Sequence, residues 1–145
     1  MDRSRRIKAL KTLQRIKEHE LDEQAAKMGV IRAAQGNLQR ERDDLDHRLE
    51  TETQITTPEA APFLAGFLHA VQRRREFIDG EMVKLDEKAA LIEGRLFETY
   101  TEVRTNENVL DKSLFEKRRE EDLAESSALE EVARNRYMRQ MGGSS

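Results

Sequence analysis

The fold is decided by the stretch from Leu64 to Leu110, which reads LAGFLHAVQRRREFIDGEMVKLDEKAALIEGRLFETYTEVRTNENVL. When it is written as heptads with Leu64 at position d and Leu68 at position a, eleven of the fourteen a and d positions are apolar. Hydrophobic residues with this spacing form one stripe along an α-helix, and the stripe packs against another helix. The stretch therefore predicts one partner of a coiled coil.

A second, looser heptad pattern runs from Ile7 to Leu49, with Ile7 at position a. Eight of its thirteen a and d positions are apolar, which is enough for a helix–helix contact. The polar members gather early, at Gln14, Lys17 and Gln24. Beside them, Leu13 and Ile16 form a second apolar stripe, so the first turns of this helix offer two faces for packing.

The residues between the two patterns read as a short break. Thr57, Pro58 and Glu59 have the signature of a helix start: a capping residue, a proline at the first helical position and an acid near the positive end of the dipole. Pro62 would remove a backbone donor if that helix continued undisturbed. We therefore expect a short capped turn, followed by the main helix from about residue 63.

The ends of the two heptad patterns lie opposite each other when the chain folds back at the break. If the turn centres near 55–58, Leu49 lies opposite 64–67 and Ile7 lies opposite 106–110, where the second pattern stops. This agreement predicts an all-α fold: an antiparallel two-helix coiled-coil hairpin whose longer C-terminal helix overhangs the first by about 30 residues. We expect a single domain over 1–141, with helices at about 3–52 and 63–140, a turn at about 53–62, and a disordered tail at 142–145.

Composition agrees with long helices. Charged residues make up 38% and aromatic residues 5%, with no Trp and two Pro. The net charge of −3 argues against binding nucleic acid through bulk electrostatics. There is no Cys, no apolar run long enough to span a bilayer and no signal-peptide core, so we expect a soluble cytoplasmic protein without membrane insertion.

Nothing in the sequence predicts catalysis. His19, His47 and His69 are far apart and lack a helical partner with metal-ligand spacing. There is no glycine-rich phosphate loop and no nucleophile with a plausible base, so we expect a non-enzyme without cofactor or metal. The basic start, Arg3 to Lys17, is either a charged helix end or a docking face for an acidic protein groove, an anionic membrane or nucleic acid.

One stretch carries a family resemblance. The sequence Ala9–Glu20, ALKTLQRIKEHE, followed by Ala25 and Ala26, resembles the first helix of the FliJ/YscO family of type III export proteins, flagellar and virulence-type. The layout is also similar: a long helix, a break before mid-chain and a longer second helix. The resemblance covers nearly the whole chain.

The resemblance implies a stalk-like coiled coil that binds a hexameric export ATPase, promotes its assembly and couples it to the export gate, with a link to export chaperones. It implies a protein at the inner-membrane export apparatus that is monomeric when free. The residues it assigns to ATPase binding are Leu10, Leu13, Ile16, Lys17, Leu123, Leu129 and Tyr137. For the gate it assigns Phe67 and Val71, whereas Arg74 and Ile78 depart from the family's pattern.

A different class also fits the pattern: a generic coiled-coil scaffold or hairpin chaperone that binds helical protein partners. Its apolar stripe would hold a client or a second copy. Light scattering separates the two, because a scaffold of this kind forms a stable oligomer whereas the stalk is mainly monomeric.

Overall fold

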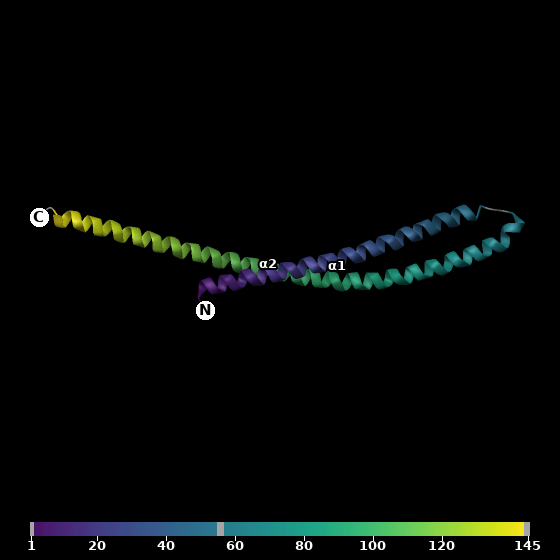
Figure 1. The fold of residues 1–145 in the computed structure, drawn as a ribbon, viewed down its shortest axis with the longest axis horizontal. Helices are drawn as coiled ribbons and strands as arrows, with labels where there is room; N and C mark the ends of the chain where they lie inside the picture. Colours follow the sequence, from purple (N-terminus) through teal and green to yellow (C-terminus); the bar gives the residue numbers. More distant parts are fainter. Residues whose placement is uncertain (1, 55–56, 144–145) are drawn as a thin grey trace. The chain divides into compact units, whose positions relative to one another are not determined.

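The computed structural model describes residues 2–54 and 57–143, and within them every regular element is helical. Helix α1 spans Arg3–Glu52, a short 3-10 helix η1 spans Pro58–Ala60, and helix α2 spans Ala61–Gly143 (Figure 1). The predicted all-α helical hairpin is confirmed. Part of the predicted turn, Ile55 and Thr56, lies outside the described residues.

The packing divides into two compact units, and each is described by itself. The terminal unit consists of residues 1–18 and 101–145, and the turn unit consists of residues 19–100. Each unit contains a segment of α1 and a segment of α2. The heptad assignment holds in both: all thirteen a and d positions of α1 are buried or half-buried, and on α2 only Leu68 is classed as exposed, at 38%.

In the turn unit, the blue segment of α1 and the teal segment of α2 run antiparallel (Figure 1). Gln35 donates a 2.7 Å hydrogen bond to Asp86, and Asp46 lies 3.4 Å from Arg75, so partners move backward along α2 as they move forward along α1. The core consists of aliphatic side chains from both helices, with Ile78 fully buried. Ion pairs on the rim close the sides of this apolar contact.

The start of α2 differs from the prediction in its capping. Thr57 takes the extended N-cap conformation, but its side chain makes no capping hydrogen bond. Its carbonyl accepts one instead, from the backbone N–H of Ala60 at 3.1 Å. Pro62 lies in the first turn of α2, which begins at Ala61, because backbone N–H groups in a first turn have no intrahelical acceptor and a proline costs nothing there.

In the terminal unit, the first turns of α1 pack antiparallel against the green part of α2 (Figure 1). Ile7 and Val103 are both 5% exposed. The pairing continues past Leu110, where the heptad pattern predicts its end: Ser113 is buried, and Arg3 forms ion pairs with Glu116 and Glu120. A polar side chain with an apolar stem, such as Arg3, can line the last turn of a helix contact, and an apolar count overlooks it.

Beyond these ion pairs, α2 continues alone. We call residues 121–143 the overhang; those whose exposure is described, 121–142, are all exposed. The overhang is shorter than predicted, roughly 35 Å at 1.5 Å per residue, because the paired region is longer. Of the predicted disordered tail, Gly142 and Gly143 belong to α2, and Ser144 and Ser145 lie outside the described residues.

Candidate partner-binding surface

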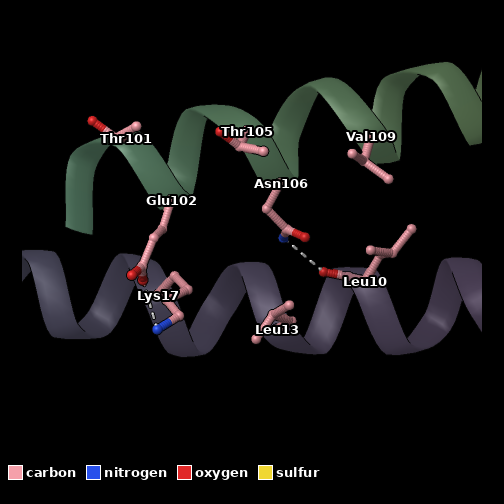
Figure 2. A pocket seen from close by; sticks show the side chains of 8 residues that line it. All are labelled: Leu10, Leu13, Lys17, Thr101, Glu102, Thr105, Asn106 and Val109. Atoms are coloured by element: carbon pink, nitrogen blue, oxygen red, sulfur yellow. Dashed lines mark hydrogen bonds and ion pairs between the residues drawn. The ribbon is translucent and has the colours of Figure 1, made fainter. Parts of the chain in front are cut away.

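An open groove lies between the helices of the terminal unit. Its volume is about 400 Å³, and most of its lining is apolar (Figure 2). Leu10 and Leu13 line it from α1, and Thr105 and Val109 line it from α2. Leu13 is 42% exposed, so a two-helix packing leaves this face uncovered. We call this surface the groove.

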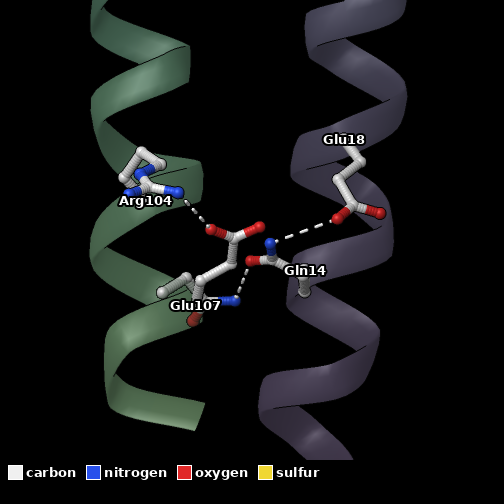
Figure 3. Close-up of polar contacts among 5 residues, drawn as sticks. Gln14, Glu18, Arg104 and Glu107 are labelled. Carbon is white, nitrogen blue, oxygen red and sulfur yellow. Dashed lines mark hydrogen bonds and ion pairs between the residues drawn. The ribbon is translucent and has the colours of Figure 1, made fainter. Parts of the chain in front are cut away.

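Polar contacts fix the floor and one end of the groove. Asn106, which is 8% exposed, donates to the Leu10 carbonyl at 3.2 Å and to the Gln14 side-chain oxygen at 2.7 Å. Gln14 in turn donates to Glu18 at 3.2 Å (Figure 3). Lys17 and Glu102 form an ion pair at 2.8 Å across the end of the groove (Figure 2). These contacts hold the two helices in register where an apolar contact alone would permit sliding.

The adjoining face of α1 is apolar along its middle and basic along its rim. A second shallow depression on this helix is lined by Arg5, Lys8, Ala9, Thr12, Leu13 and Ile16. Thr12 turns its hydroxyl inward and donates to the Lys8 carbonyl at 3.1 Å, which leaves its methyl group for a partner. Ile16 is 51% exposed. The face therefore suits a third helix that is apolar along one stripe and acidic beside it.

The overhang presents more exposed apolar side chains. Phe115, just before it, is 66% exposed. Leu123, Leu129 and Tyr137 are each 60–64% exposed. A shallow depression on this part of α2 is lined by Phe115, Arg118, Arg119, Asp122, Leu123 and Ser126. Isolated exposed apolar residues are normal, but this series continues along one unpaired helix.

The residues assigned to ATPase binding thus fall into two sets within one unit. Leu10 and Lys17 are half-buried at the groove, and Leu13 and Ile16 are exposed beside it. Leu123, Leu129 and Tyr137 are exposed on the overhang.

The residues assigned to the gate lie in the turn unit and offer little surface. Val71 is 4% exposed in the helix–helix contact, so its side chain is not available to a partner. Phe67 is half-buried, and the Arg48 guanidinium lies 5.6 Å from its ring centroid. Phe67 lies off the a/d stripe, so with Arg48 over its ring it sits at the edge of the helix–helix contact.

The basic run Arg73–Arg75 is largely neutralised within the turn unit. Arg74 donates two hydrogen bonds to Glu41, at 2.9 and 3.0 Å, and lies 4.8 Å from the centroid of the Phe77 ring. The hydrogen bond from Arg74 to Glu41 raises the pKa of Arg74 above its usual value, partial burial opposes this, and the charge of Glu41 adds to it. This run is not a free basic patch.

Sequence reasoning missed the α2 side of the groove, in particular Thr105 and Val109. The sequence does contain a signal for this side of the groove. In the heptad frame Leu13 and Val109 both fall at position g, and an antiparallel pair brings the g positions of its two helices side by side. Apolar residues at two facing g positions mark a flank that a third helix can cover.

Other site types find no support in the described part of the chain. No group of three or more His, Cys, Asp or Glu residues there could hold a metal ion. No described helix is long and apolar enough to cross a membrane. Comparison with family models, curated proteins and solved structures finds no match to this chain. Any functional proposal therefore rests on the residues described above.

Proposed function

We propose that this protein is a non-enzymatic coiled-coil component of a type III protein export apparatus, similar in role to the FliJ/YscO family. In this role it binds the hexameric export ATPase in the manner of a central stalk, promotes ring assembly, couples the ring to the export gate and is linked to export chaperones. It would act in the cytoplasm, at the periphery of the inner-membrane apparatus.

One observation carries the proposal: the terminal unit combines an uncovered groove with an unpaired helix that bears exposed apolar residues. A hairpin serving only as a spacer would need neither. Exposed Leu13 and Ile16 are flanked by Arg5, Lys8 and Lys17, which suits a protein surface that is apolar and acidic.

Contact with the export gate belongs to the same proposal, but Val71 is not offered as a gate residue because its side chain is buried. Phe67 remains a candidate because its side chain is only half-buried.

The test mixes the purified protein with the export ATPase from the same organism and measures turnover and ring assembly. The wild type should increase both. Leu13→Asp with Ile16→Asp should abolish the effect, because both changes place a charge on the exposed apolar stripe beside the groove. Val30→Asp is the matched control, since Val30 is 71% exposed on α1 but lies in the turn unit. Absence of binding by the wild type would refute the proposal.

A further inference from the structure

The side of α2 that faces away from α1 in the turn unit carries large apolar side chains at a regular spacing. Three segments of similar sequence recur every fourteen residues: FLAGFLH at 63–69, FIDGEMV at 77–83 and LIEGRLF at 91–97. Their most exposed large apolar residues, at 51–72%, are Phe63, Phe77, Val83, Leu91 and Phe97. In the heptad frame these residues fall at positions b and c, and the central glycine of each segment falls at f, so all share the face opposite the a/d stripe. We call this face the outer strip.

The glycines of the outer strip, Gly66, Gly80 and Gly94, are not required by the packing within the chain. A Cβ added at any of them meets nothing within 4 Å. Glycine inside a helix costs about 1 kcal/mol relative to alanine. It does leave a notch beside the exposed apolar side chains, where another helix can approach closely. The strip therefore alternates protruding side chains with notches, which is the surface that a helix–helix contact uses.

Two charged residues separate the notches. Arg73 lies seven positions before Gly80, and Glu87 lies seven positions after it, so both fall at position f in the middle of the outer strip. Arg74 and Arg75 form ion pairs with residues of α1. Among the described residues, Arg73 and Glu87 have no ion-pair partner, and both are exposed. These two charges are therefore available to a partner.

We propose that the outer strip binds a second copy of the chain, with the two α2 helices antiparallel around a twofold axis at Gly80. In this register each residue lies level with the residue that is equally far on the other side of Gly80. Gly66 of one copy lies level with Gly94 of the other, and Arg73 lies level with Glu87. A twofold interface requires a surface that complements itself in this way.

The protruding side chains of one copy meet the notches of the other in the same register. Phe77 lies three residues before the axis, so it is about 4.5 Å along the helix from Gly80 of the other copy. Because the segments repeat every fourteen residues, this relation recurs for the pairs Phe63–Gly94 and Leu91–Gly66. Each glycine thus receives a large apolar side chain from the other copy.

The two charges select this arrangement over its alternatives. A parallel pair in register would also align the glycines, but it would set Arg73 against Arg73 and Glu87 against Glu87. The neighbouring antiparallel registers have their axis at Arg73 or at Glu87, where a charge faces its own copy. Like charges that face each other across an interface are unfavourable. Only the axis at Gly80 brings both pairs of opposite charges together.

The size of the contact indicates a reversible dimer. Residues 63–97 span roughly 50 Å at 1.5 Å per residue, and a helix is about 10 Å wide. The two copies together would bury about 1,000 Å², which is near the lower limit for a specific interface. We therefore expect the dimer to dissociate on dilution, so that unfolding measured at low concentration reports the single chain.

The contact is confined to the turn unit. Ala61, the first residue of α2, lies level with Thr99 in this register. The export role rests instead on the groove and the overhang of the terminal unit, so either proposal can fail without the other. A reversible dimer also differs from the free monomer that the family resemblance implies.

The first experiment is sedimentation velocity over a dilution series up to about 100 µM. The wild type should form a dimer. Arg73→Glu and Glu87→Arg should each weaken self-association at least tenfold, because every facing pair then has like charges. An equimolar mixture of these two variants should form a heterodimer, and the chain carrying both changes should dimerise again, because opposite charges face each other in both cases.

Gly80→Lys separates the interface from the stability of the chain. Lysine forms helices better than glycine, so circular dichroism should show an intact helix. Two lysines at the axis repel each other, so this variant should stay monomeric. Arg95→Glu and Glu93→Arg are the matched controls, because both residues are exposed in the same segment of α2 but lie off the outer strip. Both should dimerise as the wild type does.

Disulfide cross-linking tests the direction of pairing, since the chain has no cysteine of its own. Gly80→Cys should form a covalent dimer, because this position faces its own copy. Gly94→Cys alone should not, because its two copies lie about 42 Å apart along the helices. A mixture of Gly94→Cys with Gly66→Cys should cross-link. A wild type that is monomeric at about 100 µM, a charge-reversal mixture that does not associate, or equal cross-linking of Gly80→Cys and Gly94→Cys alone would each overturn the proposal.

Discussion

The buried pair of Gln14 and Asn106 allows a quantitative test of what holds the terminal unit together. The perturbation is a double-mutant cycle with Asn106→Leu, Gln14→Leu and both changes together. The two side chains are 7–8% exposed and joined by a 2.7 Å hydrogen bond. They occupy facing positions in the helix–helix contact, where an apolar pair would also fit.

The expected magnitude follows from the contacts. Asn106→Leu removes two hydrogen bonds donated by Asn106, each with a net contribution of about 1 kcal/mol. It also leaves the Gln14 oxygen buried without that donor, at a further cost of about 1–3 kcal/mol. The new leucine contributes apolar burial that offsets part of this loss. We expect a net destabilisation of about 2 kcal/mol, or roughly thirtyfold in the unfolding equilibrium.

The double variant should recover most of that loss, because two leucines leave no unpaired buried group. The assay is urea unfolding followed by circular dichroism, together with hydrogen exchange over residues 3–18, which reports the terminal unit. The cycle should therefore show a coupling energy of at least about 1 kcal/mol. If the double variant is destabilised by the sum of the two single changes, the hydrogen bond does not couple these side chains and the reasoning fails.

Three further predictions concern the turn unit. Ile78→Ala, at a fully buried position, should lower the free energy of unfolding in urea by about 2–4 kcal/mol. Leu91→Ala, at a 68% exposed position, should lower it by less than about 0.5 kcal/mol. Equal losses would contradict the packing. Gly29→Ala and Gly80→Ala should each stabilise the helix by about 1 kcal/mol in thermal unfolding, because an added Cβ meets nothing within 4 Å; a lowered midpoint would show a contact that the structure lacks. The hydrogen bond to Glu41 raises the pKa of Arg74. The pair therefore stabilises the fold at every pH below the usual pKa of arginine, and this contribution is lost only as pH rises through the raised pKa. Arg74→Gln should shift the urea midpoint equally at pH 6 and pH 9, and a shift that differs between the two would contradict this assignment.

The heptad pattern predicted the hairpin because an apolar stripe at a and d packs against another helix, and the matching ends of the two patterns indicated a partner within the same chain. It also placed the polar members Gln14 and Lys17 correctly in the contact, since their position in the repeat is fixed by their neighbours. The heptad pattern could not predict where along α2 the contact with α1 ends. Arg3, Ser113 and Glu116 extend the contact through polar groups, and a rule that counts apolar residues stops before them.

The groove was only half predicted for a related reason. Exposed Leu13 and Ile16 stood out on α1 because they are aliphatic residues off the a/d stripe. The opposite wall contains Thr101 and Thr105, which carry no strong hydrophobic signal alone. Only the register between the helices shows that they face Leu13. Burial also decides against Val71 as a partner contact, because a residue can match a family pattern and still lie inside the helix–helix contact.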